Sequence, residues 1–123
     1  MEVTGKATER AAVLTKAVIG ASEFLGLKRP ELARAIGLSP ATLSRMYAGR
    51  YVLDEKSKNW ELAALLVRLY RGLDAIMAGD ERSLQAWMHN ANTELHDVPV
   101  RLIGNVAGLV NVVSYVDAHR ARI

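Results

Sequence analysis

The chain has 123 residues, half of them hydrophobic, which predicts one compact domain or two small lobes that share a core. It contains no cysteine, which excludes a disulfide framework and a thiolate metal site. No apolar run approaches the roughly 18 residues of a membrane helix, and the first residues lack the apolar core of a signal peptide. We therefore expect a cytoplasmic protein without a membrane segment.

Positive charge is concentrated in the first half of the chain, which has a net charge of +3 overall. Residues 1–58 carry ten Lys or Arg and six Asp or Glu, whereas residues 59–123 carry six and seven. The first half therefore has an excess of +4. Such an excess is the mild electrostatic footprint expected of a lobe that contacts phosphates.

A first helix is predicted from Thr8 to about Gly26, after a frayed tail over residues 1–6. Its apolar residues recur at helical spacing: Ala11, Leu14, Val18, Ala21 and Leu25. We expect this helix to form the platform behind the next two helices.

Residues 30–50 read as two short helices joined by a tight turn. Pro30 suits the first helical position, where its missing N–H costs nothing. Gly37 supplies the left-handed residue that ends the first helix, and the Ser39 hydroxyl can cap the second, with Pro40 at its first position. The expected buried faces are Leu32, Ala33 and Ile36 in the first helix, and Leu43, Met46 and Tyr47 in the second.

This arrangement resembles the helix-turn-helix family, in which the second helix enters the DNA major groove. Short or forked polar side chains remain on its outer face, where they can reach base edges and phosphates. The same hydrophobic spacing also fits an αα-hairpin that only packs a core, and the loop after Gly49 fits a solvated charged segment equally well. The candidate DNA-binding residues are Lys28, Arg29, Ser39, Ala41, Thr42, Ser44, Arg45 and Arg50.

The longest helix is predicted from Lys58 to Ala78, with Ser57 as its N-cap and Gly79 as its stop. Two apolar lines run along it, so it must be buried on two sides. A central helix within one domain accounts for both lines, and a homodimer contact through the first line is compatible with it. The candidate dimerisation residues on that line are Leu62, Leu66, Leu69 and Leu73.

The last third is a series of short elements. Asp80 caps a helix from Glu81 to about His89, and Pro99 starts a short helix that Gly104 ends. A final helix reaches about Ala118. Its predicted inner stripe is Val106, Leu109, Val110, Val113 and Val116.

The order of these features resembles the toxin-binding domain of the Xre/MbcA/ParS antitoxin family, and together with the helix-turn-helix the resemblance covers residues 9–123. It is carried by a Gly-Asp turn, a Trp-Met helix, an Asn-to-Leu break and a Pro-started helix. Two positions depart from the family pattern. Ala91 replaces a frequent proline, and His96 stands where a glycine is common.

The resemblance implies an all-α fold with an N-terminal helix-turn-helix lobe, residues 1–56, and a small helical toxin-binding and dimerisation lobe, residues 57–123. It also implies a type II antitoxin that pairs with a RES-domain toxin, an enzyme that destroys NAD. The C-terminal region would block the toxin's active-site cleft, and the helix-turn-helix would bind operator DNA and repress the shared operon. The implied toxin-binding residues are His119, Arg120, Arg122 and Ile123.

Two questions stay open from the sequence. The cleft of a dinucleotide-degrading enzyme can meet either the arginines of the tail or the terminal carboxylate of Ile123. A stand-alone transcriptional regulator, whose C-terminal lobe only dimerises or senses a ligand, is the alternative function.

Enzymatic chemistry is not expected. The three histidines match no zinc signature, and neither the serines nor the histidines lie in a nucleophile-elbow or triad context. No glycine-rich phosphate loop occurs. We therefore expect no catalytic residue, no metal site and no cofactor.

Overall fold

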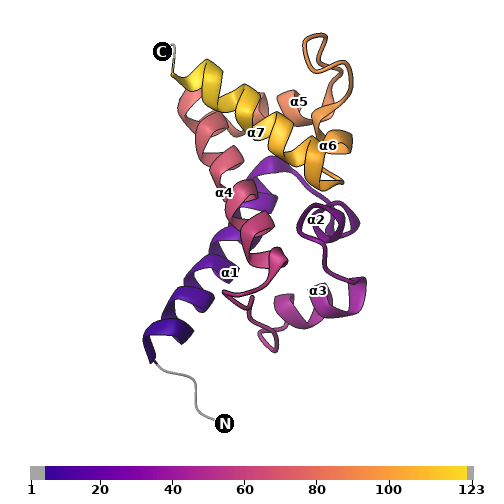
Figure 1. Cartoon of the computed structure of the whole chain (residues 1–123). Helices are drawn as coiled ribbons and strands as arrows, with labels where there is room; N and C mark the ends of the chain where they lie inside the picture. Colours follow the sequence, from indigo (N-terminus) through magenta and orange to yellow (C-terminus); the bar gives the residue numbers. More distant parts are fainter. Residues whose placement is uncertain (1–4, 122–123) are drawn as a thin grey trace.

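A computed structural model describes residues 5–121, which form seven α-helices (Figure 1). Within this range there is no strand, and a single isolated bridge joins Asn92 and Asp97. The predicted all-α fold is confirmed. The helices are α1 (Gly5–Leu25), α2 (Arg29–Ile36), α3 (Pro40–Tyr47), α4 (Lys58–Ile76), α5 (Glu81–His89), α6 (Pro99–Leu102) and α7 (Val106–Arg120).

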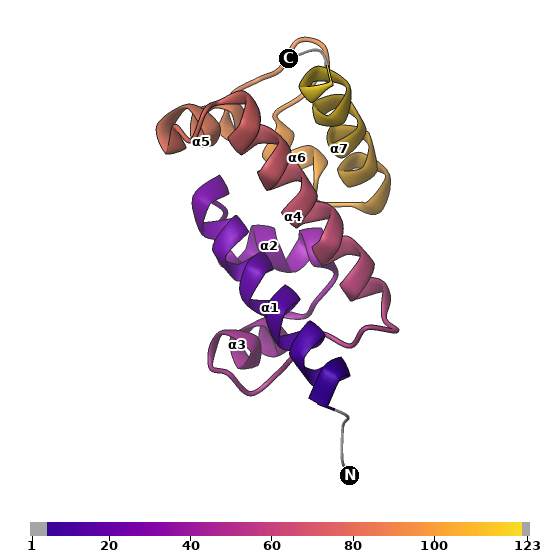
Figure 2. The same cartoon turned by 90° about the vertical axis from the view of Figure 1, so that its left-hand side faces the viewer.

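Helix α4 lies at the centre of the fold and packs against α1, α2, α5 and α7 (Figures 1 and 2). The contact between α4 and α7 is very close at Gly72, where a Cβ atom would lie 2.7 Å from Cγ1 of Val116. A larger residue at this position would overlap a methyl group of Val116, so glycine permits this close approach of α4 and α7. The prediction of a central helix buried on two sides is confirmed.

The predicted boundaries of the long helices need correction. The longest helix is α1 with 21 residues, whereas α4 has 19. Helix α1 begins at Gly5, earlier than expected, and residues 1–4 of the predicted tail lie outside the described residues. Helix α4 ends at Ile76 because Ala78 and Gly79 both adopt positive φ angles, of 52° and 79°.

The predicted inner stripe of α7 is partly wrong. Val106 and Val110 are 58% and 45% exposed, whereas Val112 is fully buried. Val110 lies about 100° around the helix from Leu109, so it falls outside the single face that packs on α4. The buried stripe consists of Leu109, Val112, Val113 and Val116.

The leucines on the first apolar line of α4 pack in the core of a single chain. Leu66, Leu69 and Leu73 are 0%, 0% and 1% exposed in a single copy, and only Leu62 is partly exposed. Side chains without accessible surface cannot contact a second copy, so the prediction that this line forms a dimer contact is wrong for these three leucines. No helix of the described range is long and apolar enough to cross a membrane.

Candidate functional site

The turn between α2 and α3 is built by local capping and by one distant side chain. Gly37 adopts a φ of 71°, the left-handed conformation that ends α2. Pro30 occupies the second helical position rather than the first, because α2 already begins at Arg29. The Asn59 side-chain amide in α4 donates to the carbonyl oxygens of Ile36 and Gly37, at 2.7 and 2.9 Å. Sequence analysis missed this contact, which locks the turn onto α4.

Helix α3 is fixed at its start and along its inner face. The Ser39 hydroxyl accepts a hydrogen bond from the Thr42 backbone N–H at 3.1 Å, and Pro40 takes the first helical position, as predicted. Leu43 and Met46 are each 2% exposed. The opposite face of α3 is thereby held toward solvent.

A short polar network runs along that outer face. Ser39 Oγ also donates to Thr42 Oγ1 at 3.0 Å, and the Arg45 guanidinium donates to the same oxygen at 3.1 Å. The three side chains therefore form one line over two helical turns. The other N–H groups of Arg45 make no hydrogen bond within the described residues, and a guanidinium can donate two such groups to a guanine.

The other candidate DNA-binding residues surround this line. Ala41 and Ser44 are exposed on α3, and Arg50 follows its end, where its backbone N–H donates to the Arg45 carbonyl at 2.8 Å. Lys28 and Arg29 are exposed at the start of α2. Arg29 is also tied to α3, because its guanidinium carbon lies 4.0 Å from the centroid of the Tyr47 ring. The structure thus gathers all eight candidates on and beside α3.

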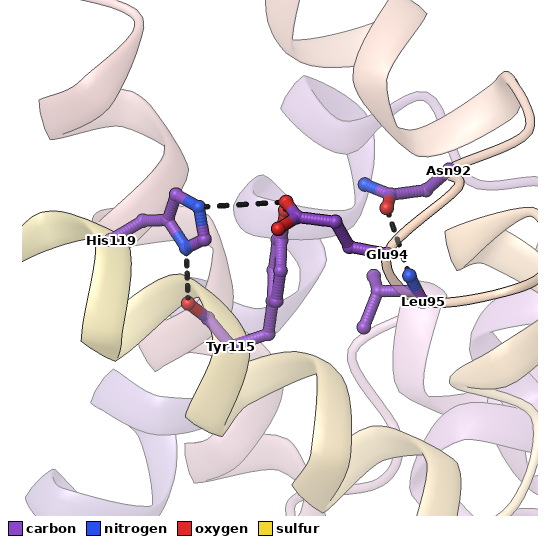
Figure 3. Close-up of polar contacts among 5 residues, drawn as sticks. All are labelled: Asn92, Glu94, Leu95, Tyr115 and His119. Carbon is purple, nitrogen blue, oxygen red and sulfur yellow. Dashed lines mark hydrogen bonds and ion pairs between the residues drawn. The ribbon is translucent and has the colours of Figure 1, made fainter.

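A second cluster lies at the far end of α7 (Figure 3). The His119 ring contacts the Tyr115 backbone carbonyl at 3.0 Å through Nδ1 and lies 3.8 Å from a Glu94 carboxylate oxygen through Nε2. The Tyr115 hydroxyl donates to the same Glu94 oxygen. Glu94 was not predicted from the sequence, because a link over 21 residues leaves no local pattern. These contacts join the loop before α6 to the last turns of α7.

The loop that carries Glu94 is itself tightly folded. The Asn92 side chain accepts from the Leu95 backbone N–H at 3.0 Å, and the Asn92 backbone N–H donates to the Asp97 carbonyl at 3.1 Å. His96 adopts a φ of 67° in this turn. A left-handed residue is needed here, which explains why glycine is common at this position in the family pattern.

The end of α7 is anchored to α4 by an ion pair. Arg68 contacts the Asp117 carboxylate at 2.8 Å through Nη2 and at 3.3 Å through Nε. One turn later, Arg120 is exposed and has no ion-pair partner within residues 5–121. The remaining predicted toxin-binding residues, Arg122 and Ile123, lie outside the described residues.

Two groups have shifted pKa values, and both lie near the junction of α4 and α5. Hydrogen bonds from Ser83 lower the pKa of the Asp80 carboxyl group, which caps α5. Burial raises the pKa of the Tyr70 hydroxyl, and the negative charge of Asp74 adds to this effect. Within residues 5–121, no three His, Asp or Glu side chains are placed to hold a metal ion.

Comparison with protein families decides what these two surfaces belong to. The model of the antitoxin Xre-like helix-turn-helix domain matches residues 5–68, more than half of the chain. The model of the antitoxin Xre/MbcA/ParS C-terminal toxin-binding domain matches residues 73–122. The chain belongs to this antitoxin family. No curated protein gives a significant match.

The family assignment indicates which class of partner each of the two surfaces belongs to. The outer face of α3 belongs to the antitoxin's helix-turn-helix domain, whose class binds DNA, and the Glu94–Tyr115–His119 cluster belongs to its toxin-binding domain. The predicted resemblance is confirmed. An antitoxin built from these two domains acts by binding a toxin and DNA.

Proposed function

We propose that this antitoxin neutralises a RES-domain, NAD-degrading toxin by blocking the toxin's active site with its C-terminal end. The observation that carries the proposal is the anchoring of the last turns of α7. Arg68 holds Asp117 from α4, and Glu94 holds Tyr115 and His119 from the preceding loop. The final residues therefore leave a rigid base, which lowers the entropic cost of inserting them into a cleft.

Two alternative contacts can block the dinucleotide-binding cleft of the toxin. Arg120 and Arg122 meet acidic groups of the toxin, or the terminal carboxylate of Ile123 meets its basic groups. Arg122→Ala weakens neutralisation in the first case. Extension of the chain by one glycine after Ile123 weakens it in the second, because the carboxylate moves away.

We also propose that α3 enters the major groove of operator DNA and that the antitoxin represses its own operon. The line of Ser39, Thr42 and Arg45 supplies the base contacts, and Lys28 and Arg29 supply phosphate contacts. A single short helix reads few base pairs, so two copies on repeated half-sites form the proposed binding unit. In this division residues 1–56 contact DNA and residues 57–123 serve toxin binding and self-association.

The test is co-expression of the antitoxin with the neighbouring open reading frame, scored by growth, cellular NAD and co-purification. Truncation after Ala118 is expected to abolish rescue of growth while an operator reporter stays repressed. Arg45→Ala is the matched control, because it should relieve repression and leave rescue intact. Equal loss of both activities in either variant contradicts the division, and a toxic neighbour that leaves NAD unchanged contradicts the RES assignment.

A further inference from the structure

A groove of about 620 Å³ lies between α1 and α4, away from both clusters described above. Figure 2 shows the two helices side by side, with α7 packed on the later part of α4. Val13, which lines the groove, is 67% exposed, the highest exposure of a large hydrophobic side chain within the described residues. The floor of this α1–α4 groove consists of Val13, Leu14, Ala17, Trp60, Ala64 and Val67.

Four arginines and one acidic residue line the rim of the α1–α4 groove, and the acidic residue, Glu9, lies beside Arg10 near the start of α1. Arg10 is paired with Glu55 at 3.3 Å and lies 6.0 Å from the Trp60 ring centroid. Arg71 and Arg120, at the end of the groove nearest the tip of α7, have no ion-pair partner within residues 5–121. That end of the groove is therefore positively charged and open to an acidic group.

The groove has the shape of a helix-binding site. Arg10 lies over Trp60, and Phe24 stacks on Tyr70 with ring centroids 5.4 Å apart, so α1 and α4 run in the same direction. The twelve residues from Trp60 to Arg71 extend about 16 Å along α4, the length of three helical turns. An amphipathic helix laid between two helices places its apolar residues on such a floor.

We propose that the α1–α4 groove binds an amphipathic helix of the toxin whose acidic residues face Arg71 and Arg120. This inference rests on the proposed function, because Arg120 belongs both to the groove and to the end of α7 assigned to toxin binding. A toxin seated on the end of α7 thereby reaches the groove over a continuous surface. The toxin then contacts helices from both family domains.

The charge and the floor of the groove disfavour other occupants. A second copy that presented the same end of the groove would bring Arg71 and Arg120 against their own counterparts, which is repulsive. A nucleic acid would find an apolar floor where its phosphates require donors. An acidic helix with apolar residues on one face can pack on the apolar floor and pair with Arg71 and Arg120 at the rim.

The experiment uses the purified toxin–antitoxin pair and measures the affinity of the full-length antitoxin for the toxin. Arg71→Glu places a negative charge against the acidic face of the toxin helix. Val13→Asp places a negative charge at an exposed position on the apolar floor of the groove. Each is expected to weaken toxin binding by about tenfold or more.

The matched controls make the same changes outside the groove. Arg50→Glu follows α3, and Val52→Asp replaces a valine that is 45% exposed; both are expected to change toxin affinity by less than about twofold.

Hydrogen exchange on the same samples supplies a second readout. Residues 9–17 of α1 are expected to gain protection when the wild-type antitoxin binds the toxin. Toxin binding without this protection, and with unchanged affinity in both groove variants, overturns the groove while the proposed function stands. Failure of the toxin to bind the wild-type antitoxin overturns both.

The two other possible occupants of the groove, a second copy of this chain and a nucleic acid, would each give a different experimental result. A change in the sedimentation of the antitoxin alone on Val13→Asp shows that the groove lies between copies of this chain. A loss of DNA affinity for Arg71→Glu as large as that for Arg50→Glu, at unchanged toxin affinity, shows a nucleic-acid surface. Either result overturns the proposal.

Discussion

Replacement of Leu69 by alanine tests whether the leucine line of α4 serves the interior of one chain. The Leu69 side chain is 0% exposed and lies in the helix against which α1, α2 and α7 all pack. Truncation of a buried leucine removes its burial and leaves a cavity, at a cost of about 2–5 kcal/mol. Because helices surround α4 on several sides and limit its collapse, we expect about 3 kcal/mol. For a chain of this size, that corresponds to a fall in Tm of roughly 10 °C.

Urea denaturation of Leu69→Ala and wild type, at protein concentrations that differ by about 100-fold, provides the assay. The loss of stability is expected to be the same at both concentrations, because it arises within one chain. Leu62→Ala, the same truncation at the partly exposed end of the line, is the matched control and should cost less than half as much. A loss of stability that grows on dilution, together with a change in sedimentation, would refute the reasoning. It would show that the leucine line forms a dimer contact.

Three further predictions address DNA binding, the loop before α6 and acid stability. Arg45→Ala should weaken binding to the operator by about 1–3 kcal/mol, whereas Lys28→Ala should weaken binding to all sequences and flatten its salt dependence, as measured by fluorescence anisotropy over a salt series. His96→Gly should raise stability by about 1 kcal/mol in urea denaturation, because it relieves a left-handed φ of 67°; a loss would show that the imidazole makes a contact worth more than the strain. The folded-state pKa of Asp80 is lowered, so its stabilising effect is full above the unfolded-state value near 3.8 and is lost as pH falls through the folded value. Asp80→Ala should therefore narrow the difference in Tm between pH 7 and pH 3, and an unchanged difference would contradict this role.

Local chemistry made the helix-turn-helix predictable. Gly37, Ser39 and Pro40 act within a few residues of themselves, and the structure places the left-handed turn, the cap and the first helical position as expected. The same holds for Ser57, whose hydroxyl accepts from the Trp60 backbone N–H at 3.2 Å at the start of α4. Capping requires only a side-chain oxygen at a fixed offset, so it is visible in the sequence.

The buried face of α7 was less predictable, because valines lie all around this helix. Val106 and Val110 are as apolar as Val112 and Val116, so hydrophobic spacing alone does not distinguish the core face from the exposed face. One observed difference is Gly72 in α4, where the absence of a side chain leaves room for Val116.

Contacts over long sequence separations carry most of what sequence analysis missed. Asn59 closes the turn before α3 from 22 and 23 residues away, and Glu94 reaches His119 from the loop before α6. Neither residue belongs to a recognisable motif, since an asparagine in the first turn of a helix or an exposed glutamate fits many roles. The chemistry of each surface could be predicted, but the side chains that hold it in place could not.

Both functional surfaces depend on α4, and this arrangement determines how the two partners meet. Asn59 in its first turn supports the turn before α3, and Arg68 two and a half turns later holds the end of α7. Figure 1 shows α3 and the C-terminal end of the described chain at opposite ends of the molecule. A toxin bound at the end of α7 therefore leaves the outer face of α3 free. We therefore expect DNA and toxin to bind one antitoxin together, and any coupling between the two sites to pass along α4, which is buried on two sides.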